Sequence, residues 1–266
     1  MGSQKGIVQI TGTFGNLTFY KSKDGFLVRE KGGIDAKRLK TDPRFQRTRE
    51  NGAEFARAGK ASKVFRKALR NLLLNIADAR MTSRLVAEMI KVIQMDEINP
   101  RGLRNVIDGE AELLTGFECN VNARLEATLV AQYNYTINRA QGMTTVDVPE
   151  FDPSRFIVAP AGATHCRLTS AGASIDFENE TFVANTSRSA DIDLAAVRQP
   201  LINMMNPIGL GTESPVFIAV GIEFFQKVNK VLYPLSNGAF NALSIVYVDG
   251  GDRSLAKAAA VQLEVV

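Results

Sequence analysis

Short alternating segments at the start of the chain predict a small antiparallel sheet. Apolar residues recur in three runs within residues 6–30, and the first run contains Ile7 and Val8. Asp24 and Gly25 form a dipeptide typical of a two-residue type I′ turn, because glycine accepts a positive φ. We therefore expect a three-strand meander, which is too small to be stable without a partner surface.

Helical spacing follows the meander. Asp42 and Pro43 are typical of a helix start, with the aspartate as N-cap and the proline at the first helical position. Apolar residues then recur every three to four positions, as expected for one face of an amphipathic helix: Phe55, Phe65, Leu69, Leu72, Leu73 and Ile76. A second helix is expected over about residues 82–94, and the two would form a basic αα-hairpin.

After residue 104 the pattern changes to short segments rich in β-branched and aromatic residues, separated by turn signals. These segments are 125–139, 143–149, 155–160, 165–171, 174–184, 215–228, 242–249 and 259–266. Such a series predicts an antiparallel β-sandwich of immunoglobulin-like or jelly-roll type. Residues 193–207 are expected to form a short helix or loop excursion between strands. The fold class is therefore α+β and mainly β.

Charge divides the chain at the same place. Residues 1–104 hold 22 Lys and Arg against 10 Asp and Glu, a net charge of +12, whereas residues 105–266 hold 10 against 18, a net charge of −8. We therefore predict a basic hairpin and helical assembly segment over 1–104 and a β-sandwich domain over 105–266. The asymmetry favours an anionic partner: nucleic acid, an acidic lipid surface, or the acidic part of another copy.

The residue types present argue against a disulfide framework, a catalytic site and a metal site. The two cysteines, Cys119 and Cys166, favour two free thiols over a disulfide framework. The chain has one histidine, His165, and in a strand its side chain would point away from that of Cys166. We therefore predict no catalytic residues, no metal site and no cofactor, and we expect that the protein is not an enzyme.

Carbohydrate binding is a weaker alternative. Asp176, Glu178 and Glu180 alternate along a predicted strand, which is more typical of a solvated face than of a glycosidase pair. The chain contains no tryptophan, the aromatic platform on which glycan-binding sandwiches commonly rely. Tyrosine or phenylalanine could take that place, so a ligand-binding or glycan-binding β-sandwich stays an alternative.

The start of the chain lacks a long apolar stretch after its first lysine, and no later run reaches the roughly 18 apolar residues of a membrane span. We therefore expect synthesis in the cytoplasm without a Sec signal peptide and no membrane span. The final location stays open among an intracellular, virion or surface assembly.

We predict one set of residues that contact another molecule. Polar contacts are predicted for cations on the hairpin and on a stripe of the first helix, and apolar anchoring for three aromatic residues. The cations are Lys21, Lys23, Arg29, Lys31, Lys60, Lys63, Lys67 and Arg70, and the aromatic residues are Phe19, Tyr20 and Phe26. The alternatives are that the cations merely solvate a helix, or that the aromatic residues pack within the chain.

The segments GNLTFYKSKDGFLVREKGG and TDPRFQRTRENGAEFARAGKASKVFR resemble the opening of a group of uncharacterised bacterial proteins. That group has the same order of hairpin, DPxFxRTREN segment and basic helix. The resemblance is strong over about residues 6–115 and loose over the predicted sandwich. It implies no assigned activity and no catalytic residues.

Together these patterns predict a structural subunit that forms a homopolymer, as a filament, tube or ring. The N-terminal meander would add a strand to a neighbouring subunit, and contacts between basic and acidic parts would set the direction. A nucleic-acid-associated structural protein is the first alternative, because Lys and Arg neutralise phosphates and aromatic side chains stack on bases.

Overall fold

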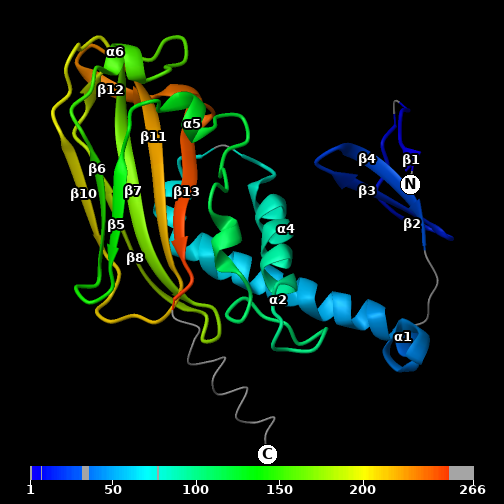
Figure 1. The fold of residues 1–266 in the computed structure, drawn as a ribbon. Coiled ribbons are helices and arrows are strands. Elements are labelled where there is room, and N and C mark those ends of the chain that lie inside the picture. Colours follow the sequence, from blue (N-terminus) through cyan, green and yellow to red (C-terminus); the bar gives the residue numbers. More distant parts are fainter. Residues whose placement is uncertain (1, 7, 32–35, 77, 252–266) are drawn as a thin grey trace, which may run out of the picture. The chain divides into compact units, whose positions relative to one another are not determined.

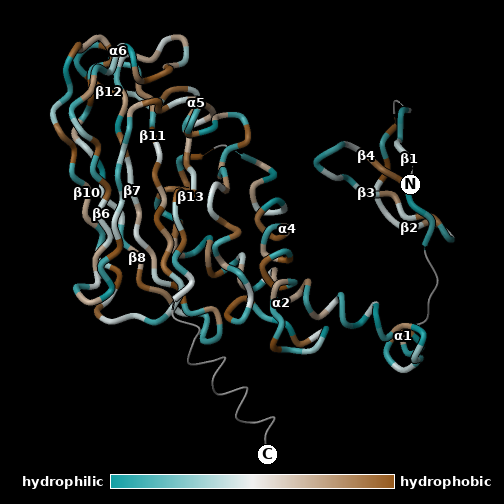
Figure 2. Tube along the Cα trace, in the orientation of Figure 1, coloured by the Kyte–Doolittle hydropathy of each residue, from teal (hydrophilic) through white to brown (hydrophobic). Residues whose placement is uncertain are grey.

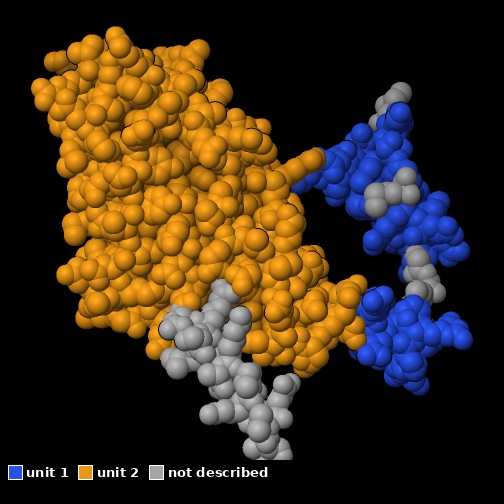
Figure 3. Space-filling model, in the orientation of Figure 1, with its two compact units in different colours: residues 1–49 blue, residues 50–266 orange. Residues whose placement is uncertain are grey.

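The computed structural model describes residues 2–6, 8–31, 36–76 and 78–251. Contacts divide the chain into two compact units, Met1–Arg49 and Glu50–Val266 (Figure 3). Strands hold 35% of the residues and helices 27%, and all strand pairs are antiparallel, so the fold is α+β and mainly β. The immunoglobulin-like or jelly-roll arrangement stays a prediction. The predicted strand at 259–266 lies outside the described residues, as does Ile7.

The N-terminal unit holds a four-stranded sheet in the order β1-β4-β3-β2. Its elements are β1 (Gly2–Ser3), β2 (Gly12–Phe14), β3 (Leu17–Ser22), β4 (Gly25–Glu30), α1 (Ala36–Thr41) and the 3-10 helix η1 (Pro43–Phe45). The meander prediction is confirmed for β3 and β4, and β2 extends it as a third antiparallel strand beside β3. The residues around Val8 do not form the expected first strand, and β2 begins later, at Gly12.

The hairpin turn differs from the predicted one by a residue. The ladder closes at the pair Ser22 and Gly25, so Lys23 and Asp24 form the tip. Gly25 has a φ of +106°, whereas neither tip residue has a positive φ, which rules out a type I′ turn. The Ser22 hydroxyl accepts a hydrogen bond from the Asp24 backbone N–H at 3.0 Å and stabilises this turn.

The first long helix begins where the sequence predicts. The Asp42 carboxylate accepts a hydrogen bond from the Arg44 backbone N–H at 3.0 Å, and Pro43 occupies the first helical position of η1. The chain then continues into α2 (Gln46–Ala68). The predicted second helix is α4 (Met81–Gln94), and the short α3 (Arg70–Leu73) lies between them.

The strands of the second unit form two sheets (Figure 1). The larger contains β7 (His165–Asp176), β8 (Thr181–Arg188), β9 (Ile192–Asp193), β11 (Val216–Val228), β12 (Val231–Pro234) and β13 (Ala242–Asp249). The smaller has the order β10-β6-β5, with β5 (Asn134–Asn138), β6 (Met143–Val148) and β10 (Ile202–Pro207). Short helices lie in the connections: η2 (Ala111–Leu114), α5 (Leu125–Thr128), α6 (Pro153–Phe156) and η3 (Leu235–Gly238).

Both faces of β7 and β11 are buried. Alternate residues of a strand point to opposite faces, and here each face meets a different layer. Ala171 and Phe217 belong to a core that includes α2 and α4, and the rings of Phe65 and Phe217 meet edge to face at 5.2 Å. Leu168 and Val220 belong to a second core shared with β6 and β10. Figure 2 shows this apolar character most plainly along the first part of β11.

The helices from residue 50 onward therefore share a core with the strands. The compact units divide at Arg49, and not at residue 104 where the net charge changes sign. The physical reason is that α2 and α4 bury their apolar faces on the larger sheet.

Residues 193–207 depart from the expected helix or loop excursion. Ile202–Pro207 forms β10, which pairs along its whole length with β6, from Ile202 opposite Val148 to Pro207 opposite Met143. The burial pattern alternates with a period of two.

Gly172 allows the two sheets to approach each other closely. A Cβ atom at this position of β7 would lie 2.1 Å from Thr144 Oγ1 and 3.0 Å from Ile208 Cγ2. Neither neighbour can retreat freely, because Thr144 and Ile208 are themselves buried. The absence of a side chain at this point is therefore a packing requirement of the fold.

We expect Gly172→Ala to lower the free energy of unfolding by about 1–3 kcal/mol, since the extra methyl group overpacks the core. Gly59→Ala is the matched control, because a Cβ at this helical position has open space around it. It should be neutral or should stabilise by up to about 1 kcal/mol. Equilibrium urea unfolding measures both, and equal effects of the two substitutions would contradict the packing role of Gly172.

Candidate assembly interface

The N-terminal sheet has no core of its own. No described residue between 2 and 49, in the sheet or in the helices after it, is buried. Apolar side chains are instead exposed, including Val8 (78%), Phe14 (61%) and Leu17 (43%). Sheets this small need a covered apolar face to be stable in water. The N-terminal unit by itself therefore leaves these apolar side chains uncovered.

The strand register sorts the predicted contact residues onto two faces. Phe19 pairs with Val28 and Lys21 with Phe26, so these four side chains share one face. Phe14 extends this face, and its ring meets that of Phe19 at 6.0 Å. The Lys21 ammonium lies 5.5 Å from the centre of the Phe26 ring. This face is apolar with a cation at the hairpin end, and we call it the aromatic face of the N-terminal sheet.

Tyr20 and Arg29 lie on the opposite face. The Arg29 guanidinium is 5.5 Å from the centre of the Tyr20 ring, a distance at which a cation is attracted to an aromatic ring. Lys23 is exposed at the hairpin tip, and Lys31 is exposed just after β4. The predicted hairpin residues thus surround the small sheet and do not form one patch.

The predicted stripe on the first helix is present on one exposed face of the second unit. Lys60, Lys63 and Lys67 of α2 and Arg70 of α3 are all exposed, whereas Val64 and Phe65 on the other side are buried. Lys60 forms one ion pair, with Glu180 at 3.7 Å. Such exposed pairs contribute between about 0 and 1 kcal/mol, so the stripe stays available for an anionic partner.

The sequence prediction is wrong for Phe55. The spacing placed it on the apolar face of the helix, but it is 59% exposed. Ten residues separate it from Phe65, which at about 100° per residue rotates it about 80° away from the buried face. It lies among Gly52, Ala56 and Gly59, and added Cβ atoms at the two glycines would meet open space.

The residues weighed for catalysis do not assemble into a site. Cys119 and Cys166 are free and buried, and burial raises the pKa of each thiol to about 12. The His165 ring contacts the Thr164 hydroxyl at 3.0 Å. Asp176 accepts hydrogen bonds from the backbone N–H groups of Glu178 and Asn179, so it shapes a turn. Within the described ranges, no group of three or more His, Cys, Asp or Glu could hold a metal ion.

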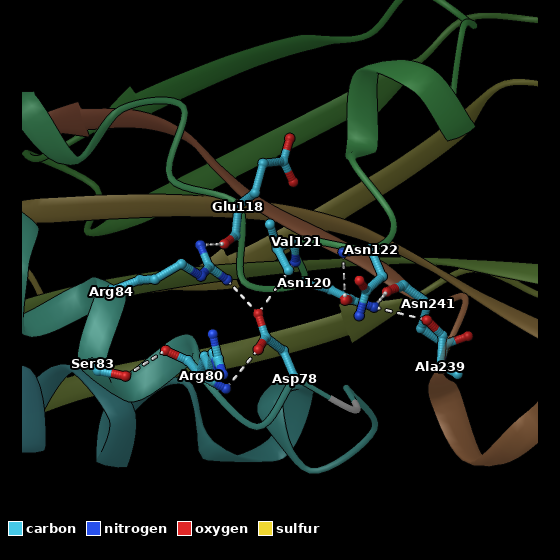
Figure 4. Close-up of polar contacts among 10 residues, drawn as sticks. All are labelled: Asp78, Arg80, Ser83, Arg84, Glu118, Asn120, Val121, Asn122, Ala239 and Asn241. Carbon is cyan, nitrogen blue, oxygen red and sulfur yellow. Dashed lines mark hydrogen bonds and ion pairs between the residues drawn. The ribbon is translucent and has the colours of Figure 1, made fainter. Parts of the chain in front are cut away.

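A polar cluster that sequence reasoning missed joins the helices to the strands (Figure 4). Arg84 at the start of α4 donates hydrogen bonds to the Asp78 carboxylate and, at 2.8 Å, to the Glu118 backbone carbonyl. The backbone N–H groups of Arg80 and Val121 also donate to Asp78. Nearby, the Asn120 amide donates to the carbonyls of residues 239 and 241.

The Asp78 side chain is 4% exposed. Burial by itself would raise the pKa of this carboxyl, but the hydrogen bonds from Arg80, Arg84 and Val121 outweigh it, so the pKa is lowered. The ionised form is therefore the one that the folded protein stabilises. This cluster is a structural junction, and only its spatial convergence reveals it, since residues 78, 118 and 239 are far apart in the sequence.

We expect Asp78→Asn to lower the free energy of unfolding by about 2 kcal/mol near neutral pH, because it removes charge-assisted hydrogen bonds. A carboxyl with a lowered folded pKa contributes stability above its unfolded pKa and loses that contribution as the pH falls through the folded pKa. The difference between wild type and variant should therefore shrink on acidification.

Chemical unfolding at a series of pH values measures this difference. Glu97→Gln, which changes an exposed carboxyl, is the control and should have little effect. A difference for Asp78→Asn that stays constant from neutral to acidic pH would contradict the role of the ionised carboxylate.

No known protein family, characterised protein or solved structure matches this chain. The resemblance of the N-terminal segment to a bacterial group therefore stays a prediction. Among the described residues, no helix is long and apolar enough to cross a membrane.

Proposed function

We propose that this protein is a structural subunit that assembles with other copies of itself through its N-terminal sheet. One observation carries the proposal: none of the described residues between 2 and 49 is buried, although several are large and apolar. Removing such side chains from water contributes about 25 cal/mol per Å² of apolar surface. A neighbouring subunit that covers the aromatic face would supply the core that this sheet lacks.

Two further features support self-assembly over a single closed contact. The outer strands of the N-terminal sheet are β1 and β2, and an outer strand presents backbone N–H and C=O groups with which a strand of a neighbour can pair. The charge of the first 49 residues is also strongly positive, with 11 Lys and Arg against 4 Asp and Glu. In this proposal the two sheets of the second unit form the predicted β-sandwich, and its acidic surface receives the neighbour.

Nucleic-acid association is the second candidate, supported by the exposed stripe of Lys60, Lys63, Lys67 and Arg70. Regularly spaced cations on one helix face can follow a phosphate backbone. Binding of this kind would weaken steeply as the salt concentration rises. Glycan binding stays an alternative, but no feature described above supports it.

We expect the purified, nuclease-treated chain to form regular filaments, tubes or rings in negative-stain electron micrographs at moderate salt. A variant that lacks residues 1–33 should not form them, and neither should Phe14→Asp/Leu17→Asp, because charges on the aromatic face oppose its burial. Leu210→Asp is the matched control: Leu210 is an exposed apolar residue (81%) of the second unit, and its replacement should leave assembly intact.

Monodisperse monomers in all samples would contradict the proposal. In that case, binding of a single-stranded oligonucleotide to wild type and to a variant with the four stripe cations changed to Ala would test the second candidate. Circular dichroism of each variant would verify that the larger unit stays folded.

A further inference from the structure

A cavity of about 450 Å³ in the second unit is rich in negative charge. Six carboxylates line it: Glu97, Asp108, Glu110, Asp176, Glu178 and Glu213. None of the Lys, Arg or His residues that the structure describes belongs to this lining. Between them lie apolar side chains such as Ile98, Ile107 and Phe177. We call this the acidic groove. Its lining mixes carboxylates with apolar side chains.

Three separate segments of the chain bring these carboxylates together: the loop between α4 and η2, the end of β7 with the turn after it, and the loop before β11. Glu97 follows α4, Asp108 lies in the loop before η2, Glu178 lies in the turn between β7 and β8, and Glu213 precedes β11. The concentration of like charge costs electrostatic energy in the isolated chain. A cationic partner would relieve this cost.

Hydrogen bonds hold the loop at residues 97–110, on one side of the groove, in place. The Asp96 carboxylate, which is 1% exposed, accepts hydrogen bonds from the backbone N–H groups of Ile98, Asn99 and Asn105. Burial alone would raise the pKa of Asp96, but these bonds outweigh it and lower the pKa. The Asn99 and Asn105 amides also donate to Asp108, at 2.8 and 2.7 Å. The loop that carries half of the groove is therefore preorganised.

Hydrogen bonds also fix the segment of the groove that contains Asp176 and Glu178. A hydrogen bond from the Asn179 side chain is the main reason that the pKa of Asp176 is lowered, so this carboxyl stays ionised near neutral pH. Glu97, Glu178 and Glu213 are exposed, and they form no ion pair with any residue that the structure describes. These three carboxylates are available to a partner.

The spread of the carboxylates favours a surface with several cations over a metal ion. The described part of the chain has no group of three or more acidic, His or Cys residues placed to hold a metal. A neighbouring cavity shares Ile107, Asp108, Phe177 and Glu178 with the groove and adds Arg57 and Lys60, so the negative region ends on that side. The partner must therefore present both positive charge and apolar surface.

We propose that the acidic groove receives the cationic hairpin end of the N-terminal sheet from a second copy of the chain. This inference rests on the proposed function and names the receiving surface. The hairpin combines Lys21, Lys23 and Phe26 at one end of a unit that is strongly positive, which complements a groove lined by carboxylates and apolar side chains. The two surfaces differ, so the contact is head-to-tail and propagates into a ring or filament.

A charge exchange tests this pairing in the full chain. Glu178→Lys/Glu213→Lys should weaken self-association at least about tenfold in sedimentation velocity, because it places cations opposite the hairpin cations. Lys21→Glu/Lys23→Glu should do the same for the opposite reason. Mixing the two variants should restore assembly, since each mixed contact then joins opposite charges. Glu126→Lys/Glu150→Lys, with the same change in net charge outside the groove, should assemble as wild type does.

Each other result overturns a defined part of the proposal. If Phe14→Asp/Leu17→Asp abolishes assembly but Glu178→Lys/Glu213→Lys does not, the N-terminal sheet mediates assembly through another surface and the groove inference fails. If both charge variants lose assembly and their mixture does not recover it, the hairpin and the groove are not partners. If wild type stays monomeric at all concentrations, the proposed function and the groove inference fail together.

Discussion

The burial of β7 and β11 on both faces is the constraint on which the rest of the second unit depends. A strand covered on two sides cannot alternate apolar and polar residues, and β11 is buried without interruption over its first nine residues. Polar groups in this environment need partners. Asn206 reaches the Ser170 hydroxyl at 2.8 Å, and Glu223 accepts a hydrogen bond from Asn75 at 2.6 Å.

Two layers cover these strands, and each explains part of the sequence. The helices supply Phe65, Leu69 and Met89 to one core, and β6 and β10 supply Val146 and Met204 to the other. The close approach of the smaller sheet requires Gly172, and the side chains of Asp78 and Arg84 tie the helix layer to residues 118–121. The well-packed unit is therefore the one that extends from Glu50 onward.

The N-terminal sheet presents the opposite physical situation. Its strands form a regular ladder, yet its apolar side chains stay exposed and its charge is strongly positive. In the second unit the buried loop network around Asp96 gathers carboxylates instead. An apolar, cationic surface and an apolar, anionic groove within one chain form the physical basis for the head-to-tail assembly that we propose.

The sequence by itself determined the features that depend on neighbouring residues. The Asp42 cap, helix α4, the β3–β4 hairpin and the charge division all follow from local spacing and residue type, because capping and amphipathic periodicity act over a few positions. The tertiary structure alone decided which strands are covered on both faces. It also decided that 202–207 is a strand, because β6 supplies its hydrogen-bonding partner, and that Phe55 points away from the core. The same holds for the acidic groove, whose carboxylates are brought together by packing between residues 97–110, 176–178 and 213.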